Sequence, residues 1–198
     1  MTLTPGAWVP VAAQDDLVPG HVYQTRLGGS DGVLRELAIW RARDGTVNIW
    51  DDRCPHRGVR FSLGEVVEDQ LVCRYHAWRF ASGSGQCRFI PAQPGLTPPT
   101  TIRARAWPVA ERGGLVWTGF APEGEPPPPG KGVPIRAIPV DCNVTRVRAA
   151  IAGFAGADLL LQPLGDGRCV IRGWCPASSL VAVDAALEAL RRTLEAPC

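Results

Sequence analysis

Two cysteines and two histidines lie close together in one short stretch of the chain. The segment from Arg53 to Trp78, RCPHRGVRFSLGEVVEDQLVCRYHAW, holds two of the seven cysteines and two of the three histidines. The spacing is Cys54-x-His56, sixteen residues, and then Cys73-x-x-His76. Thiolate and imidazole are the side chains that bind transition metals best. The pattern therefore predicts a metal site with Cys54, His56, Cys73 and His76 as its ligands.

The choice of metal depends on how the ligands are shared between the two segments. Each segment offers one thiolate and one imidazole, whereas zinc sites usually pair two like ligands in one loop. A Cys2His2 zinc ion is thus the alternative. Mixed segments favour a binuclear iron cluster, in which one iron takes both thiolates and the other takes both imidazoles, with two sulfides between them.

The segment from Trp8 to about Phe120 resembles the Rieske domain of the ring-hydroxylating and demethylating non-haem iron oxygenases. The motifs that carry the resemblance are AWVPVA, DDRCPHRG, LVCRYHAWRF and GQCRFIPA. The sequence departs from the usual second motif at Arg74, where proline is common, and at Ala77, where glycine is common. The resemblance implies a Rieske-type 2Fe-2S cluster held by Cys54, His56, Cys73 and His76. The respiratory Rieske proteins are a poorer match, because they carry an extra cysteine in each loop and a membrane anchor.

The ligand set also has consequences for charge. The charges of two ferric ions, two sulfides, two thiolates and two neutral imidazoles sum to zero, so reduction leaves the cluster with a single negative charge. The reduction potentials of Rieske clusters accordingly lie at about −150 to +300 mV, above those of plant-type ferredoxins. Five arginines lie in or beside the two segments: Arg53, Arg57, Arg60, Arg74 and Arg79. They are expected either to favour the reduced state and meet an acidic redox partner, or to form an ordinary solvated surface. Trp78 and Phe80 are expected to pack beneath the two segments.

A complete oxygenase of this kind also holds a mononuclear iron on two histidines and a carboxylate. If His56 and His76 bind the cluster, only His21 remains, and no histidine follows Pro134. We therefore expect an electron-transfer component of an oxidoreductase system. The first hypothesis is a ferredoxin-like carrier that accepts electrons from a flavin or ferredoxin reductase and donates them to a non-haem iron oxygenase. The alternatives are a Rieske subunit of a split or hetero-oligomeric oxygenase, and a protein in which the cluster only stabilises the fold or senses redox state.

The elements that must position these ligands are short strands. From Val9 to about Phe120 the chain shows alternating or apolar runs separated by turn signals, which predicts an antiparallel β domain over residues 1–120. Hairpin turns are predicted at Arg43–Thr46 and at Glu111–Gly114. Residues 121–134, APEGEPPPPGKGVP, are predicted to be a proline-rich linker that cannot continue a sheet.

Residues 135–198 are predicted to form a small α+β tail. Val144, Val147, Ile151 and Phe154 share one helical face, and Leu180, Val183, Leu187, Leu190 and Leu194 share another, after a possible cap at Ser178 or Ser179. A hairpin is predicted at the GDG sequence between these two helical segments.

Composition excludes some classes of partner. A formal net charge of +2 argues against nucleic acid and acidic membranes as partners. No signal peptide or membrane span is visible, and seven irregularly spaced cysteines fit reduced thiols, so we predict a cytoplasmic protein. The other cysteines, Cys87, Cys142, Cys169, Cys175 and Cys198, are expected to lie outside any metal site. His21 is expected at a surface or edge.

Overall fold

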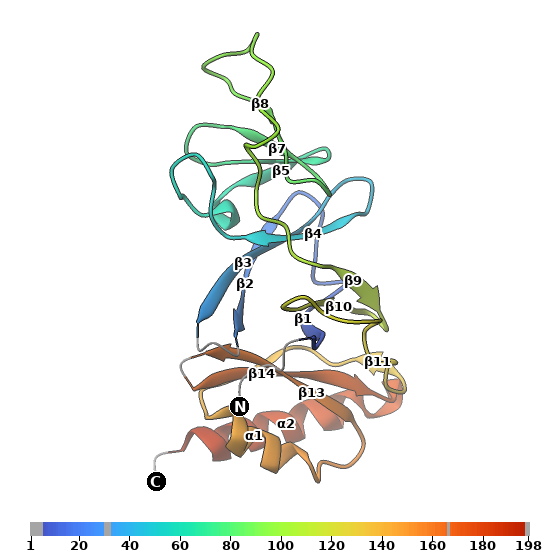
Figure 1. The fold of residues 1–198 in the computed structure, drawn as a ribbon. Helices are drawn as coiled ribbons and strands as arrows, with labels where there is room; N and C mark the ends of the chain where they lie inside the picture. Colours follow the sequence, from blue (N-terminus) through green and yellow to red (C-terminus); the bar gives the residue numbers. More distant parts are fainter. Residues whose placement is uncertain (1–5, 30–32, 166, 197–198) are drawn as a thin grey trace. The chain divides into compact units, whose positions relative to one another are not determined.

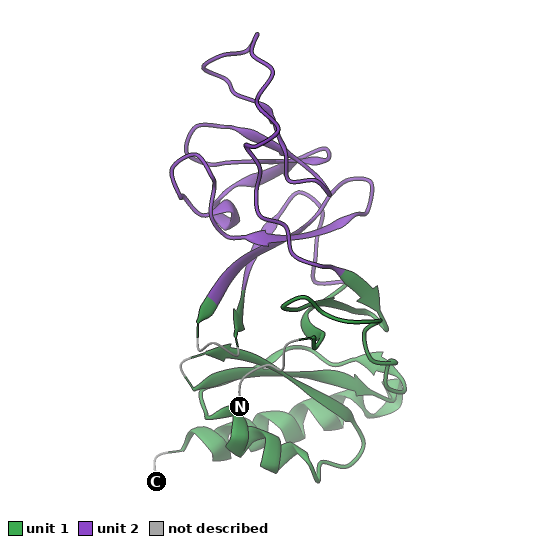
Figure 2. Cartoon of the chain, viewed as in Figure 1, with its two compact units in different colours: residues 1–14, 26–34, 110–198 green, residues 15–25, 35–109 purple. Residues whose placement is uncertain are grey.

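The fold is mostly antiparallel β, as the sequence predicts. A computed structural model describes residues 6–29, 33–165 and 167–196 (Figure 1). The chain divides into two compact units (Figure 2). Unit 1 comprises residues 1–14, 26–34 and 110–198, and unit 2 comprises residues 15–25 and 35–109. Among the described residues, no helix is long and apolar enough to cross a membrane.

Two sheets supply the strands of unit 2. The first sheet has the order β2 (Val22–Gly28), β3 (Leu34–Arg41), β4 (Val47–Asp51), and strands β2 and β3 run on into unit 1 at one end. The second has the order β5 (Glu65–Val67), β6 (Gln70–Val72), β7 (Arg79–Ala81), β8 (Cys87–Phe89), preceded by a 3-10 turn, η1 (Phe61–Leu63). The predicted turn at Arg43–Thr46 is confirmed, because β3 and β4 pair antiparallel from Arg41 opposite Val47.

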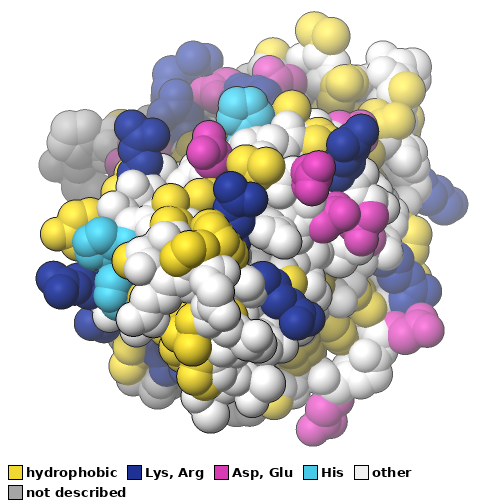
Figure 3. Space-filling view, turned by 90° about the horizontal axis from the view of Figure 1, so that it is seen from above, with side chains coloured by type: hydrophobic (Ala, Val, Ile, Leu, Met, Phe, Trp, Pro, Cys, Tyr) yellow, Lys and Arg dark blue, Asp and Glu magenta, His cyan; other side chains and the backbone are white. Residues whose placement is uncertain are grey.

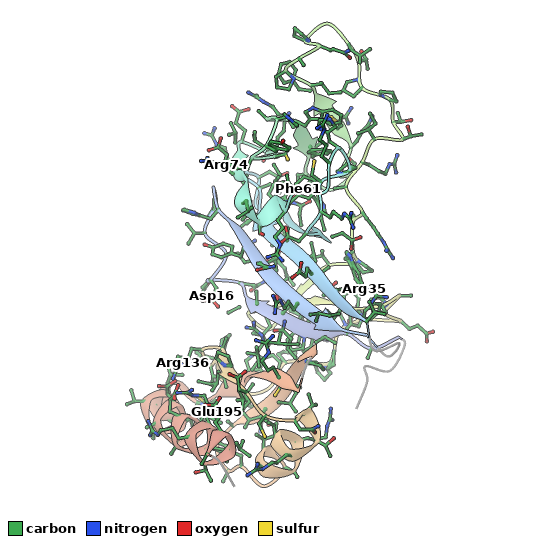
Figure 4. The ribbon with its side chains drawn as sticks, turned by 90° about the vertical axis from the view of Figure 1, so that its left-hand side faces the viewer. Asp16, Arg35, Phe61, Arg74, Arg136 and Glu195 are labelled. Carbon is green, nitrogen blue, oxygen red and sulfur yellow. The ribbon has the colours of Figure 1, made fainter. Side chains whose placement is uncertain are left out.

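Aromatic side chains fill the core of unit 2. Trp50 makes edge contacts with Trp40 at 5.1 Å and with Phe61 at 5.6 Å between ring centroids, and Phe61 contacts Phe80 at 5.1 Å. Phe80 is therefore a packing residue, as predicted, and Figure 4 marks Phe61 on η1. Cys54, Cys73 and Cys87 belong to the same buried cluster. The backbone at the predicted metal ligands is thus anchored directly to a rigid core.

Unit 1 holds two further sheets and both α-helices. One sheet has the order β1 (Val9–Ala13), β10 (Leu115–Thr118), β9 (Ala110–Arg112), and the predicted hairpin at Glu111–Gly114 joins its last two strands. In the other, β14 (Arg168–Cys175) pairs with β13 (Asp158–Gly165) and with β11 (Val133–Pro134) and β12 (Ile138–Val140). The predicted GDG hairpin joins β13 and β14, although its Asp166 lies outside the described residues.

The two tail helices form where the apolar spacing predicts them, but their caps differ from expectation. Helix α1 (Val144–Ile151) begins after Asn143, whose side chain accepts a hydrogen bond of 2.8 Å from the Thr145 amide. Helix α2 (Leu180–Glu195) follows a 3-10 turn, η2 (Ala177–Ser179), and Ser179 makes no side-chain capping bond. Ser179 thus occupies the predicted N-cap position, but it does not cap the helix through its side chain, because the 3-10 turn already leads the backbone into the helix.

Helices α1 and α2 bury apolar side chains against the β11–β14 sheet. Their buried residues Val147, Val183, Leu187 and Leu194 share one hydrophobic cluster with Ile138 and Ile171 of the sheet. On the solvent side, Arg136 pairs with Asp184 and Glu188 of α2 (Figure 4). The Arg136 guanidinium, followed by Arg191, lowers the pKa of the Glu188 carboxyl. Helix α2 is therefore fixed both by burial and by exposed ion pairs.

The proline-rich segment ends earlier than predicted. Val133 and Pro134 pair with Cys175 and Trp174 as strand β11, so the expectation that residues 121–134 cannot enter a sheet is wrong at its last two positions. The strand lies at a sheet edge, where proline is tolerated because no neighbour needs its missing amide hydrogen. The Ile135 amide resumes the ladder with a hydrogen bond of 2.9 Å to the Gly173 carbonyl.

The tail is tied to the N-terminal strand and to the β9–β10 turn within unit 1. Arg172 is buried and donates hydrogen bonds to the Val11 carbonyl at 2.7 Å and to the Gln162 side chain at 3.0 Å. The Trp174 indole donates to the Gly113 carbonyl at 2.6 Å. The limits of the compact units therefore differ from residues 120 and 134. The division of the chain into a Rieske domain, a linker and a tail stays a prediction.

Candidate metal centre

The first pair of predicted ligands lies in a tight loop after strand β4. Residues 54–59 form this loop, which we call the Cys54 loop. The Cys54 amide donates a hydrogen bond to the Val59 carbonyl, and the Gly58 amide donates one to the Cys54 carbonyl, both at 2.8 Å. Gly58 has a φ of +75°, a left-handed conformation that glycine adopts without a steric penalty. The loop buries Cys54 and leaves His56 half-buried.

The second pair lies in a loop of the same design between strands β6 and β7. In this Cys73 loop, residues 73–78, the Cys73 amide donates to the Trp78 carbonyl and the Ala77 amide donates to the Cys73 carbonyl, both at 2.9 Å. Ala77 has a φ of +53°. Alanine at this position and Arg74 beside the cysteine therefore leave the loop geometry intact. Cys73 is buried and His76 is exposed.

The two loops bring their ligands together as two like pairs. The Nδ1 atoms of His56 and His76 are 3.1 Å apart, and the Cys54 and Cys73 thiols are hydrogen-bonded to each other. Among the described residues, no three His, Cys, Asp or Glu side chains are grouped around one point as ligands of a single ion. Figure 3 shows two His side chains adjacent at the surface, with basic side chains beside them.

The contacts within each pair shift the acidities of its members. The hydrogen bond between the thiols lowers the pKa of Cys73 and raises the pKa of Cys54, because the Cys54 thiol as donor stabilises a thiolate at Cys73. Burial, followed by the charges of His76 and Arg57, lowers the pKa of His56. The two shifts favour a thiolate at Cys73 and a neutral imidazole at His56, which are the forms of these side chains that bind metals.

Aromatic rings flank both imidazoles. Trp78 stacks on His56, with ring centroids 4.0 Å apart and planes 9° apart, so it packs against a predicted ligand rather than below the loops. Tyr75 stacks on His76 with centroids 3.9 Å apart. The sequence reasoning did not assign a role to Tyr75, although its place between Cys73 and His76 made contact with the site predictable. These rings hold the two imidazoles in position.

A buried carboxylate fixes the start of the Cys54 loop. Asp52 is 4% exposed and accepts hydrogen bonds from the Ser62 amide at 2.7 Å and the Ser62 hydroxyl at 2.6 Å. Its own amide donates to the Glu36 carbonyl at 2.9 Å. Asp52 therefore links the loop to η1 and to strand β3, a role that the sequence alone did not reveal.

The other candidate residues lie apart from these four. His21 is exposed next to Tyr23, as predicted. Cys87 is buried in the core of unit 2. Cys142, Cys169 and Cys175 are buried in the hydrophobic cluster of the tail, where they act as packing residues, and Cys198 lies outside the described residues.

Comparison with known proteins shows which family the ligand-bearing segment resembles. Residues 7–102 belong to the Rieske [2Fe-2S] domain family, whose cofactor is a Rieske-type 2Fe-2S cluster. The chain is 43% identical over 120 residues to oxidoreductase NdmD of Pseudomonas putida, covering 60% of this chain and 20% of that protein. It is 35% identical over 113 residues to the oxygenase subunit of 3-chlorobenzoate-3,4-dioxygenase of Comamonas testosteroni, covering 56% of this chain and 24% of that subunit.

A solved structure extends the likeness of the fold beyond the family segment. NdmA of Pseudomonas putida CBB5 matches with a TM-score of 0.75 over 97% of this chain and 81% of its own, at 16% identity. This shows that the tail shares in the fold of that protein. The chain spans only about a sixth to a third of the length of the curated relatives it matches, at 17% of one and 32% of another.

The donor set fits the cofactor of the family. A Rieske cluster needs two thiolates on one iron and two imidazoles on the other. The chain presents two thiols as one pair and two imidazole Nδ1 atoms as another, on two loops with matching hydrogen bonds. When bound, such a cluster accepts and returns one electron.

Proposed function

We propose that the chain is a one-electron carrier in which Cys54, His56, Cys73 and His76 hold the Rieske cluster. The observation that carries the proposal is the meeting of two like pairs, thiol with thiol and imidazole with imidazole, at the ends of the two loops. The buried thiols would hold such a cluster from within the core of unit 2, and the exposed His76 would hold it from the surface. A redox partner can therefore approach the imidazole side.

The electron donor in this proposal is a flavin or ferredoxin reductase, and the acceptor is a non-haem iron oxygenase. Relatives such as the oxygenase subunit of 3-chlorobenzoate-3,4-dioxygenase support a place in an oxygenase system. The 198 residues hold one histidine besides the proposed ligands, so they do not supply the two histidines of a mononuclear iron site.

The proposal is tested by counting the electrons that the protein takes up and by replacing the proposed ligands. The purified protein should contain two irons and two sulfides per chain, take up one electron, and return it to an oxygenase that lacks its own Rieske loops. His56→Ala and Cys73→Ala should lose the visible absorption of the cluster, whereas His21→Ala should keep it. A zinc content of one per chain, or full absorption in either ligand variant, would refute the assignment.

A second candidate is a Rieske subunit of a split oxygenase, whose catalytic iron lies on another chain. The likeness to the oxygenase subunit of 3-chlorobenzoate-3,4-dioxygenase favours it, because that relative is itself one subunit of an oxygenase. Size-exclusion chromatography with iron analysis separates the two: a stable stoichiometric complex with an iron-bearing chain supports the subunit, and rapid exchange without a stable complex supports the carrier.

A further inference from the structure

A basic hollow lies beside the Cys54 loop in unit 2. It has a volume of about 370 Å³, and Cys54 and His56 form part of its lining. Four arginines also line it: Arg53, Arg57, Arg103 and Arg105. Two of them come from the ligand segment and two from a segment almost fifty residues later. An occupant of this hollow would therefore lie against a proposed cluster ligand and among several guanidinium groups.

The positive charge of the hollow is not balanced by its acidic residue. Asp51 accepts a hydrogen bond of 2.6 Å from the Trp107 indole and lies 3.7 Å from the Arg105 guanidinium. Within the described part of the chain, Arg53, Arg57 and Arg103 make no ion pair. The hollow thus gathers an excess of about three positive charges, although the whole chain carries only +2.

We propose that this hollow receives carboxylate side chains of an acidic electron-transfer partner and so docks that partner against His56. The inference rests on the proposed function and names the chemistry of the partner. Guanidinium groups bind carboxylates with two parallel hydrogen bonds, which orients as well as attracts them. Because His56 lines the same hollow, a partner seated there touches the imidazole side of the cluster site directly.

The exposure of the arginines favours a protein surface over a small anion. All four side chains are exposed, and single ion pairs at exposed sites contribute little to affinity. A set of charges on a partner acts differently, because complementary surfaces steer the approach and raise the association rate, and this effect weakens with salt. The predicted signature is therefore a fast, salt-sensitive encounter rather than tight binding of one ion.

The experiment uses the cluster-containing protein and two probes of opposite charge. Reduced ferredoxin of strongly negative net charge gives one electron to the oxidised protein, and oxidised cytochrome c of positive net charge takes one electron from the reduced protein. Stopped-flow rates are measured for the unmodified protein and for R103E/R105E. The control R146E/R148E makes the same charge change at exposed arginines of helix α1.

The unmodified protein should react with ferredoxin at a rate that falls as salt is added. R103E/R105E should lower that rate about tenfold at low salt and raise the rate with cytochrome c, whereas R146E/R148E should stay within about twofold. The neutral variant R103Q/R105Q should give a smaller loss of the same sign. The visible spectrum and the midpoint potential of each variant show whether cluster and driving force are unchanged.

The inference is overturned if the rate of electron transfer from ferredoxin does not depend on salt, or if R103E/R105E and R146E/R148E lower that rate equally. It is also overturned if inorganic phosphate inhibits the reaction while R103E/R105E has no effect on the rate, because the hollow would then be a small-anion site only. Failure of the proposed function looks different, because the protein would then exchange electrons with neither probe.

Discussion

Ala77 occupies in the Cys73 loop the place that Gly58 occupies in the Cys54 loop. Each follows its cysteine by four positions, donates its amide hydrogen to that cysteine's carbonyl, and has a positive φ, +53° for Ala77 and +75° for Gly58. The two halves of the candidate metal centre are therefore built on one backbone design. They differ in that only one of them has the residue for which this conformation carries no steric penalty.

Ala77→Gly should raise the stability of unit 2 by about 1 kcal/mol, because alanine pays a steric penalty in the left-handed region that glycine does not. The reverse change, Gly58→Ala, should lower stability by at least as much, since an added methyl would lie 3.1 Å from Arg53 Nε. Ala106→Gly, at an exposed residue without a positive φ, is the control and should be neutral or slightly destabilising. Thermal unfolding followed by cluster absorbance measures all three, and a loss of stability in Ala77→Gly contradicts the account.

Asp52→Ala should make the centre labile, because it leaves the Ser62 amide and hydroxyl without their acceptor at the start of the Cys54 loop. Loss of a buried charged hydrogen-bond partner costs about 2 to 3 kcal/mol. The rate at which a chelator bleaches the visible absorption should rise at least tenfold. Asp69→Ala, at an exposed carboxylate of unit 2 that accepts a hydrogen bond from the Asp44 amide, should bleach at the unmodified rate. Equal rates for all three proteins would show that Asp52 does not hold the loop.

Arg172→Met should loosen the tail and leave the metal centre unchanged. The change removes the buried hydrogen bonds to Val11 and Gln162, and leaving a buried neutral acceptor without its donor costs about 1 to 3 kcal/mol. Limited proteolysis should then cut within residues 135–196 while the visible spectrum persists. Arg148→Met on the exposed face of α1 is the matched control. Unchanged resistance to proteolysis in Arg172→Met would mean that the tail does not depend on this contact.

Cys169 should make the tail sensitive to alkaline pH. Burial, with a smaller effect of Cys142, raises the pKa of the Cys169 thiol to about 11 from an ordinary value of 9.0. Because the folded-state pKa is raised, the protonated thiol contributes its full stabilisation below pH 9, and this contribution is lost as pH rises through 11. The loss in unfolding free energy reaches about 2 kcal/mol by pH 10.5. The difference in unfolding free energy between pH 8 and pH 10.5 should therefore be smaller by about that amount in Cys169→Val. An identical pH dependence in both proteins would contradict the buried thiol.

The sequence predicts the parts of this structure that depend on local patterns. The hairpins at Arg43–Thr46 and Glu111–Gly114 follow from turn chemistry, and the helix α2 follows from apolar spacing. The four candidate ligands follow from residue type and spacing alone, and the structure brings them together in pairs.

The features that the sequence did not reveal depend on contacts between distant residues. Arg103 and Arg105 join Arg53 and Arg57 in one hollow only after the intervening strands have folded. The hydrogen bond from Trp174 to Gly113 joins residues 61 positions apart, so the grouping of the tail with β9 and β10 was not predictable from local patterns. The edge strand β11 was missed because its proline argued against any strand.

The most direct test of the central claim is pulsed EPR of the reduced protein with ¹⁵N-labelled histidine, in the His21→Ala background. The account predicts couplings from two histidine nitrogens, both Nδ1, because these are the atoms of His56 and His76 that face each other at 3.1 Å. Coupling to one nitrogen or to none would show that the two imidazoles do not share an iron.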